Sequence, residues 1–344
     1  MDLQIINPIN YPDWDNLLLK TPAYSFFHSS AWAKVLSESY HYVPTYFTLF
    51  HNDKIVALIP MMDIQSALTG NRGVALPFTD YCEPIMSEDA QLQDIFLQLV
   101  NYGKKANWRF IELRDGANFF QDATPYATYF GHSLVLSLDE EYCFFHFKGS
   151  TRRNIRKALA EGVEIKILNS MESIREFYKL NCLTRKRHGL PSQPYHLFKS
   201  IYDNIISEDR GLVVMAYYKN IAIAGAVYFH LGDKAIYKYG ASDRRYQHLR
   251  ANNLVMWEAI KWYCRNGYQS FYFGRTEMEH VGLRQFKIGW GAEEYPILYY
   301  RYSLRKSIFL TEKRSNLTMF HDLFSRLPVP LLKMIGRILY RHMG

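Results

Sequence analysis

The feature that most constrains the fold is a strand, helix, strand, helix order between residues 234 and 294. A strand-like run at 234–239 leads into an amphipathic helical run that stops at Asn266-Gly267, a common helix-ending pair. A short aromatic strand at 270–273 follows, and then a second helix that stops at 289–291. This order predicts an α/β domain whose ligand-binding groups lie where the strands end.

The N-terminal part of the chain shows a similar alternation. Strands are predicted at 45–50 and 54–62, with a turn at His51-Asn52-Asp53 between them, and a helix is predicted from Ser87 to about residue 105. A length of 344 residues favours two domains over one. We therefore predict domains at 1–147 and 148–304, followed by a tail at 305–344.

The positive charge is concentrated in that tail. The whole chain has a formal net charge of +8, and residues 305–344 contain eight Lys or Arg against two acidic residues. The remaining body is therefore nearly balanced, which argues against a protein whose whole surface coats nucleic acid.

The end of the tail has the pattern of a basic amphipathic helix. Apolar residues fall on one predicted face and basic residues on the other: Leu331, Ile335, Ile338 and Leu339 against Lys333, Arg337 and Arg341. Such a helix can lie on an anionic bilayer, so residues 328–342 are a candidate peripheral membrane contact. The alternative is that its apolar face packs on the N-terminal domain.

Cysteine and hydropathy patterns indicate the compartment. The four cysteines are far apart and form no Cys-x-x-Cys pair, so neither a zinc site nor a disulfide framework is expected. The first residues lack the basic and apolar regions of a signal peptide, and no apolar run reaches about 18 residues. We expect a cytoplasmic protein, free or peripheral on the inner face of the cytoplasmic membrane.

A second basic segment begins the predicted C-terminal domain. Residues 150–158 form a helix start with four cations, of which Arg152 and Arg156 are one turn apart. Arginine holds phosphate or carboxylate through a planar fork, so this pair could grip an anionic donor or acceptor. A solvated helix face is the simpler interpretation.

Several motifs together resemble the FemAB/FemX family and its relatives with a BioF-like acetyltransferase domain. They are Ser150-x-Arg152-x-x-Ile155-Arg156-x-Ala158, Tyr239-Gly240-Ala241-Ser242, Ala251-Asn252-Asn253-Leu254-x-x-Trp257-Glu258-Ala259-Ile260, Phe273-Gly274-Arg275 and Phe286-Lys287-x-Gly289-Trp290-Gly291. The resemblance implies an α/β fold of two tandem domains of the GNAT (general N-acetyltransferase) type. Each would have a mixed parallel and antiparallel sheet flanked by helices.

The family resemblance also implies acyl transfer from an activated donor to an amine. The donor is aminoacyl-tRNA in the peptidoglycan-bridge enzymes and an acyl thioester in relatives. GNAT enzymes typically bind the coenzyme A pyrophosphate on a glycine-containing loop that opens a helix. The equivalent residues here, 247–252, contain no glycine, which makes acyl-CoA the weaker donor candidate and aminoacyl-tRNA the stronger. We expect no tightly bound cofactor.

The resemblance assigns Lys287 to the lysine near the reacting acyl group. Its charge would stabilise the tetrahedral oxyanion, a contribution of roughly 3–4 kcal/mol for one well-aimed donor. The alternative is a surface lysine on an amphipathic helix. Glu258 is a candidate base, or a residue that only orients Arg275 or Lys287.

The other candidate site residues would bind substrate. Arg275 follows a glycine at a strand end, where it could contact phosphate or carboxylate or else pair with Glu277 or Glu279. Further candidates, each of a residue type that is also common in ordinary loops and cores, are Phe286 as a wall of the acyl pocket, Tyr239 and Asn252 as hydrogen-bonding groups, and Asp80 and Tyr81 as N-domain contacts to the acceptor.

Three hypotheses follow for the function. The first is a FemAB-like N-acyltransferase acting on an amine of a cell-envelope precursor, either peptidoglycan or polysaccharide. The second is an acyl-CoA-dependent N-acetyltransferase on an amino sugar or lipid-linked glycan, which calorimetry with coenzyme A would distinguish. The third is a non-catalytic envelope-assembly adaptor, in which case a Lys287→Ala protein would fully complement a deletion strain.

Overall fold

The chain forms two compact units in a computed structural model that describes residues 3–87, 92–116, 119–120, 122–311 and 318–344. The first unit contains residues 1–129, 296–314 and 339–344, and the second contains 130–295 and 315–338. The predicted ranges 1–147 and 148–304 therefore differ from these units, because each unit gathers segments from distant parts of the chain.

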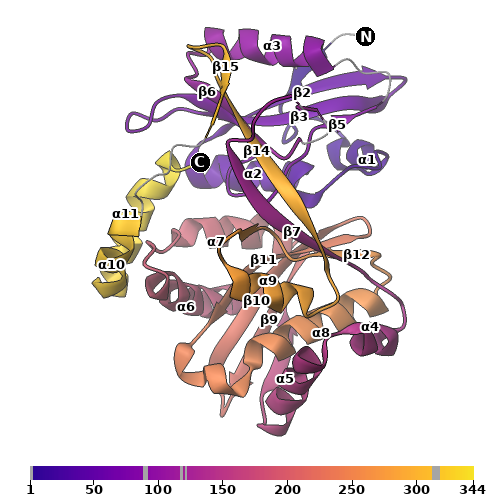
Figure 1. The fold of residues 1–344 in the computed structure, drawn as a ribbon, viewed down its shortest axis with the longest axis vertical. Helices are drawn as coiled ribbons and strands as arrows, with labels where there is room; N and C mark the ends of the chain where they lie inside the picture. Colours follow the sequence, from indigo (N-terminus) through magenta and orange to yellow (C-terminus); the bar gives the residue numbers. More distant parts are fainter. Residues whose placement is uncertain (1–2, 88–91, 117–118, 121, 312–317) are drawn as a thin grey trace. The chain divides into compact units, whose positions relative to one another are not determined.

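The first unit is a mixed sheet with helices (Figure 1). Its strands are β1 Leu3–Ile6, β2 Val43–His51, β3 Lys54–Ile64, β4 Arg72–Val74, β5 Ile85–Met86, β6 Phe110–Arg114 and β15 Ile308–Leu310. Its helices are α1 Trp14–Leu19, α2 Ser30–Tyr40 and α3 Leu92–Lys105. β4 and β6 pair in parallel, whereas β1, β2 and β3 form an antiparallel meander.

The turn between β2 and β3 and the beginning of α3 were both predicted from the sequence. The turn at His51-Asn52-Asp53 does join two strands, and Asn52 and Asp53 have φ values of 49° and 57°, which is the conformation of a tight hairpin. The predicted start of the next helix falls partly on residues 88–91, which lie outside the described residues; α3 is described from Leu92.

The second unit contains most of the helices. They are α4 Glu140–His146, α5 Gly149–Ala160, α6 Met171–Arg187, α7 Tyr195–Ile201, α8 Ala251–Arg265, α9 Val281–Ile288, α10 Thr318–Arg326 and α11 Val329–Leu339. Its strands are β8 Glu164–Leu168, β9 Gly211–Tyr218, β10 Ile221–Leu231, β11 Lys234–Ser242, β12 Ser270–Tyr272 and β13 Thr276–Glu277. Strands β7 Ala127–Val135 and β14 Glu293–Ser303 each have residues in both units.

The sheet of the second unit has the strand order β7-β12-β11-β10-β9-β8. β11 and β12 are parallel, and the other neighbours are antiparallel. The parallel pairing covers only residues 234–236 and 270–272, although β11 continues to Ser242. The two strands therefore separate after Ile236, which leaves room at the carboxyl end of β11.

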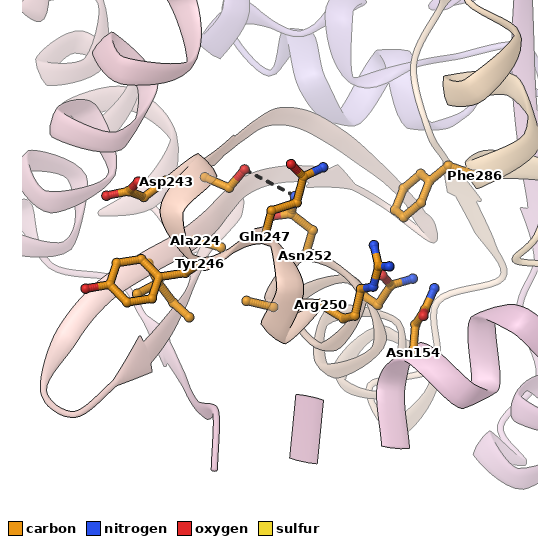
Figure 2. A pocket seen from close by; sticks show the side chains of 12 residues that line it. Asn154, Ala224, Asp243, Tyr246, Gln247, Arg250, Asn252 and Phe286 are labelled. Carbon is orange, nitrogen blue, oxygen red and sulfur yellow. Dashed lines mark hydrogen bonds between the residues drawn. The ribbon is translucent and has the colours of Figure 1, made fainter. Parts of the chain in front are cut away.

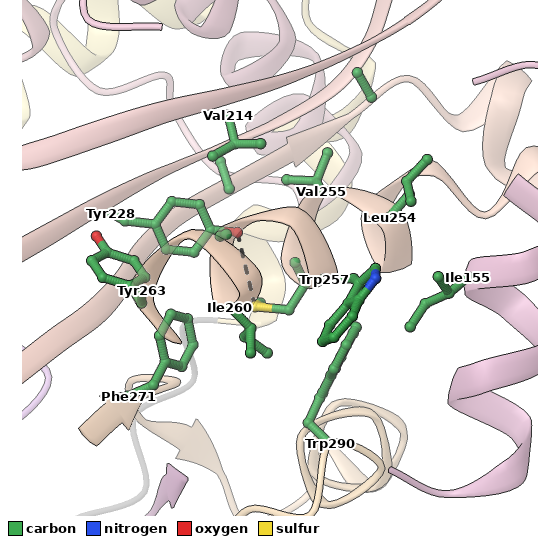
Figure 3. Packing of buried hydrophobic residues seen from close by; sticks show 14 of the residues in the cluster. Ile155, Val214, Tyr228, Leu254, Val255, Trp257, Ile260, Tyr263, Phe271 and Trp290 are labelled. Carbon is green, nitrogen blue, oxygen red and sulfur yellow. Dashed lines mark hydrogen bonds between the residues drawn. The ribbon is translucent and has the colours of Figure 1, made fainter. Parts of the chain in front are cut away.

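The core of this unit lies between the sheet and helices α5 and α8. The buried strand residues Val214 and Tyr228 face Val255 and Ile260 of α8 (Figure 3). The Tyr228 hydroxyl donates to Met256 Sδ over 3.8 Å. Full burial of each such side chain contributes roughly 1.5–3 kcal/mol, so α8 is held firmly against the sheet.

A bulge divides the aromatic residues of β11 between the two faces of the sheet. The register with β10 shifts between Val227 and Tyr228, so Tyr237 packs on Tyr228. Tyr239 instead packs on Phe229 and on Phe198 of α7. In a regular strand, residues two apart share a face, and the extra residue of the bulge breaks that rule.

The tail packs differently from the prediction. Leu332 is fully buried, the Lys333 ammonium lies 5.0 Å from the Tyr178 ring centroid, and Gly336 lies against Ser192, all within the second unit. Residues 339–344 belong to the first unit, where the carbonyl oxygen of Gly344 accepts from Arg72.

The predicted apolar face of this helix is wrong at Ile338, whereas Leu331, Ile335 and Leu339 are half-buried. Ile338 is 56% exposed and Met334 is 55% exposed, whereas the buried positions of the helix are Leu332 and Gly336. No helix in the described part of the chain is long and apolar enough to cross a membrane.

Gly336→Ala tests this packing, because an added Cβ would lie 1.8 Å from the Ser192 carbonyl oxygen. We expect overpacking to lower the free energy of unfolding by about 1–3 kcal/mol, measured by urea denaturation. Gly282→Ala in α9 is the control, since nothing lies within 4 Å of its added Cβ. Equal stability of the two variants would contradict the described contact.

Candidate functional site

A cleft lies at the carboxyl end of β11, beside the beginning of α8. It consists of two adjoining pockets of about 210 Å³ and 180 Å³ that share Asn252 and Phe286. The first pocket is also lined by polar residues, including Asn154, Gln247 and Arg250, as Figure 2 shows. The second is mostly apolar and is lined by Tyr237, Met256 and Leu283 among others.

The loop between β11 and α8 forms one wall of the polar pocket. Asp243 begins it and accepts a hydrogen bond from the Arg245 backbone at 3.0 Å; the Arg245 guanidinium beside it lowers the pKa of its carboxyl group. Arg250 ends the loop with φ of 59°, a left-handed conformation that favours glycine. The first residue of α8 therefore follows directly on a tight reversal of the chain.

The family resemblance implies that Arg250 lies where the GNAT loop, of the pattern Gln/Arg-x-x-Gly-x-Gly/Ala, carries its first glycine. The backbone conformation that glycine would permit is retained, at a cost of about 1–3 kcal/mol for a non-glycine residue. Its side chain lies beside that of Asn154 in the pocket (Figure 2). Asn252, two residues further on, donates to Ser242 Oγ over 3.3 Å.

Tyr237 supplies a hydroxyl to the apolar pocket. Burial raises its pKa to about 12, so the phenol stays protonated at neutral pH. The hydroxyl lies over Gly240, and a Cβ at that residue would come within 1.6 Å of the oxygen. The glycine of the Tyr239-Gly240 motif is therefore explained by the space that Tyr237 needs.

Lys287 is buried, with only 2% of its surface exposed, and so is not the surface lysine considered as its alternative. Its ammonium donates to the carbonyl oxygens of Gly274 and Arg275 at 2.8 and 3.1 Å. Two of the sequence motifs are thereby joined by one side chain. Lys287 lines neither of the two pockets of the cleft, although its neighbour Phe286 lines both.

A charged network adjoins Lys287. His132 is buried, and its Nε2 donates to Glu294 at 3.0 Å; Glu294 also accepts from Arg284 at 2.7 and 2.9 Å. Burial, with the positive charge of Lys287, lowers the pKa of His132 to about 4. A neutral imidazole is therefore expected there at neutral pH.

Two further predicted residues lie in local ion pairs. Glu258 pairs with Lys261 one turn along α8 at 2.7 Å, and no hydrogen bond or ion pair with Arg275 or Lys287 is among its described contacts. Arg275 approaches Glu277 at 4.0 Å, which was the structural alternative considered for it. Solvent-accessible pairs of this kind contribute about 0–1 kcal/mol.

The remaining predicted residues are dispersed. Arg156 lies over the Phe144 ring at 5.6 Å and lines a different pocket, and Arg152 is half-buried on α5. Tyr239 lies against α7, on the other face of the sheet from the cleft. Asp80 and Tyr81 belong to the first unit, where the Asp80 carbonyl oxygen accepts from Tyr299 at 2.7 Å and Tyr81 packs on Phe27.

Of the predicted site, the structure brings together Asn252 and Phe286 in the cleft and joins Lys287 to Arg275 behind it. Asn154, Tyr237, Gln247 and Arg250 line the cleft and were not predicted as site residues. Gln247 and Arg250 lie in the segment identified as the equivalent of the GNAT loop, so position in the motif was the available signal. Nothing in the sequence distinguishes Asn154 or Tyr237 from their neighbours.

Diverging parallel strands with a cleft at the start of the following helix define a GNAT-type acyltransferase fold, and residues 146–295 match the acetyltransferase (GNAT) domain family. FemX has a similar structure, with a TM-score of 0.68 and 14% identity over 89% of this chain and 98% of FemX. A tandem GNAT protein from the clavulanic acid biosynthesis pathway has a TM-score of 0.56 and 8% identity over 88% of this chain and 99% of that protein.

Curated relatives match a shorter part of the chain. The lipid II:glycine glycyltransferase of Staphylococcus epidermidis is 33% identical over 79 residues, which is 21% of this chain and 19% of the relative. That of Staphylococcus haemolyticus is 34% identical over 77 residues, 21% of this chain and 18% of the relative. The predicted tandem GNAT fold is confirmed, and the acyltransferase class predicted for residues 146–295 agrees with the domain match. The short matches to the glycyltransferases agree with the predicted resemblance to FemAB-like proteins.

His132 makes folding stability sensitive to acid. The unfolded imidazole titrates near 6.5 and the folded one near 4, so the unfolded chain binds more protons between these values and stability falls as pH falls through this window. From pH 7.5 to 5 we expect His132 to account for a loss of about 2 kcal/mol. Urea denaturation at both pH values should show a smaller loss for His132→Gln, and an equal loss would contradict the assignment.

Proposed function

We propose that this protein is an N-acyltransferase of the FemAB type that transfers an aminoacyl or acyl group to an amine of a cell-envelope precursor. The observation that carries the proposal is the cleft at the end of β11, in which a polar pocket and an apolar pocket meet at Asn252 and Phe286. The apolar part suits an acyl side chain and the polar part suits the charged body of the donor.

The donor enters, in this proposal, at the start of α8. Backbone N–H groups at the beginning of a helix attract phosphate, and α8 has 15 residues. The exposed side chain of Arg250 adds a positive charge in the same pocket. Aminoacyl-tRNA is the first candidate donor and acyl-CoA the second, and both present phosphate beside an activated acyl carbon.

The acceptor is proposed from the named relatives, which are lipid II:glycine glycyltransferases. A neutral amine attacks the acyl carbon, the bond to the donor oxygen or sulfur breaks, and the amine proton leaves with the donor group or solvent. The acceptor then gains one amide bond. Tyr237 is a neutral hydroxyl at the apolar end and can hydrogen-bond the substrate there.

Lys287 is proposed to act on the reaction through its charge. Held by the carbonyl groups of Gly274 and Arg275 in a buried position, its ammonium cannot reorient freely and so stays directed at one place. A fixed charge of this kind stabilises an oxyanion better than a mobile one. Lys287 follows Phe286, which lines both pockets of the cleft. The other proposed contacts rank lower because they neither line the cleft nor adjoin in sequence a residue that does: Glu258, Arg152, Arg156, Arg275, Tyr239, Asp80 and Tyr81.

A transfer assay tests the function. The purified protein is incubated with lipid II and either glycyl-tRNA or acetyl-CoA, and the mass of lipid II is followed by mass spectrometry. We expect a mass increase of one aminoacyl or acyl group, and none when the acceptor amines have been acetylated beforehand. No increase with either donor would overturn the proposed reaction on this acceptor.

Lys287→Met separates chemistry from packing. We expect kcat to fall about 10²–10³-fold with little change in KM for the acceptor, because the charge acts on the transition state. Loss of the donor for two buried carbonyl groups also destabilises the protein, by about 1–3 kcal/mol. Gly336→Ala is the control for lowered stability, and an equal loss of activity in both variants would assign Lys287 a structural role.

Arg250→Gly tests the donor pocket. Glycine relieves the left-handed strain, so we expect thermal stability to rise slightly, while loss of the guanidinium raises KM for the donor by about ten-fold. Arg245→Gly is the matched control, since Arg245 is in the same loop and is paired with Asp243. Unchanged donor KM in Arg250→Gly would place the donor phosphate elsewhere.

The proposed site of action is the inner face of the cytoplasmic membrane. Residues 328–342 remain a proposed contact with an anionic bilayer, now through the exposed residues Met334, Arg337, Ile338 and Arg341.

A further inference from the structure

A third pocket lies between α4 and α5, separate from the cleft. It has a volume of about 280 Å³ and is lined mainly by apolar side chains: Phe144, Phe145, Ile155, Leu159 and Trp257, together with Arg156, Glu140 and Glu141. α5 separates it from the cleft, because Asn154 lines the cleft and the next two residues line this pocket. No step of the proposed reaction uses it.

The rim of this pocket is unusually apolar for a surface. Phe145 of α4 is 63% exposed and Leu159 of α5 is 54% exposed. Tyr142, which is also on α4, is 56% exposed. Large apolar side chains gathered around a cavity are typical of a surface that binds another molecule. An exposed aromatic residue with a polar tip, such as Tyr142, is also common at membrane interfaces.

The charge around the pocket favours an anionic partner. α5 carries Arg152, Arg153, Arg156 and Lys157 within two turns. Of the two acidic residues that line the pocket, Glu140 is held by the Arg265 guanidinium through two hydrogen bonds of 2.8 and 2.9 Å. Within the lining, Glu141 then faces Arg156, and the other three cations of α5 add positive charge beside the pocket.

We propose that this pocket binds a hydrocarbon chain of an anionic membrane lipid, with the lipid phosphate against α5. Apolar walls accept the chain, and the cations of α5 contact the headgroup, which is the pattern of interfacial binding by a basic helix with aromatic and aliphatic neighbours. An acidic protein segment would need hydrogen-bonding groups inside the cavity, whereas the lining there is mainly aromatic and aliphatic.

The consequence is that the GNAT domain docks on the bilayer with the cleft one helix away from the lipid. A membrane-linked acceptor would then meet the cleft without leaving the membrane. The binding itself does not depend on the proposed transfer reaction, so its failure and the failure of the transfer assay are separate results.

Vesicle flotation tests the proposal with the full chain. We expect the protein to float with vesicles of phosphatidylcholine mixed with phosphatidylglycerol and to float poorly with phosphatidylcholine alone. Phe145→Ser with Leu159→Ser should weaken binding by about ten-fold or more, because two large apolar contacts are lost. Both side chains are more than half exposed, so this variant should keep the wild-type melting temperature.

The matched control is Met334→Ser with Ile338→Ser, which removes two exposed apolar residues from the tail. We expect this control to retain the part of the binding that the pocket supplies. A pocket variant that floats as well as the wild type would overturn the proposal, and so would a wild type that floats with neither vesicle.

Fluorescence distinguishes a lipid chain in the pocket from headgroup contact alone. Phospholipids brominated along their acyl chains should quench the emission of Trp257, which lines the pocket. Quenching should therefore be smaller in Trp257→Phe than in the wild type. Equal quenching in both proteins would show that the chain does not enter, and the proposal would be wrong.

Discussion

The short parallel pairing of β11 with β12 is the constraint on which the second unit depends. Three residues of each strand pair, and the strands then separate, so the end of β11 has space beside it. The segment after β12 cannot close that space, because the Lys287 ammonium holds the carbonyl groups of Gly274 and Arg275. A buried charge with two short hydrogen bonds is costly to move, so the opening is built into the fold.

The residues that follow Lys287 connect the cleft to the beginning of α5. The Gly289 carbonyl oxygen accepts from the Thr151 hydroxyl and from the Lys148 backbone, both at 2.9 Å. A Cβ on Gly289 would lie 2.7 Å from the Thr151 oxygen, which explains a glycine there. Trp290 then packs on Phe147 and Phe286. Motifs more than 100 residues apart thus form one packed unit around the cleft.

Sequence periodicity was a good guide to element order and a poor guide to side-chain direction. The strand, helix, strand, helix order from 234 to 291 is present, and Asn52-Asp53 forms the predicted turn. Tyr239 is predicted to hydrogen-bond the substrate, but a one-residue bulge turns it toward Phe198. A bulge depends on how two strands pair, and neither strand's own sequence contains that information.

The candidate site shows the same limit in its charged residues. The pairing of Glu258 with Lys261 follows from their spacing on one helix, so local sequence was sufficient to expect it. Local sequence was not sufficient to expect the burial of Lys287, since a lysine on a short helix is usually exposed. The buried ammonium is stabilised by hydrogen bonds to the carbonyl groups of Gly274 and Arg275, which lie outside α9.

The loop before α8 shows why an absent motif residue is weak evidence by itself. The missing glycines argued against coenzyme A because they remove space for a phosphate. Arg250 nevertheless has the left-handed conformation that the first glycine would take, so the loop shape persists while its surface changes. In place of the two glycines that the family resemblance implies, this loop has Arg250 and Asn252, and both side chains line the pocket. The donor proposed for this pocket would therefore be held by the side chains of Arg250 and Asn252 rather than by bare backbone.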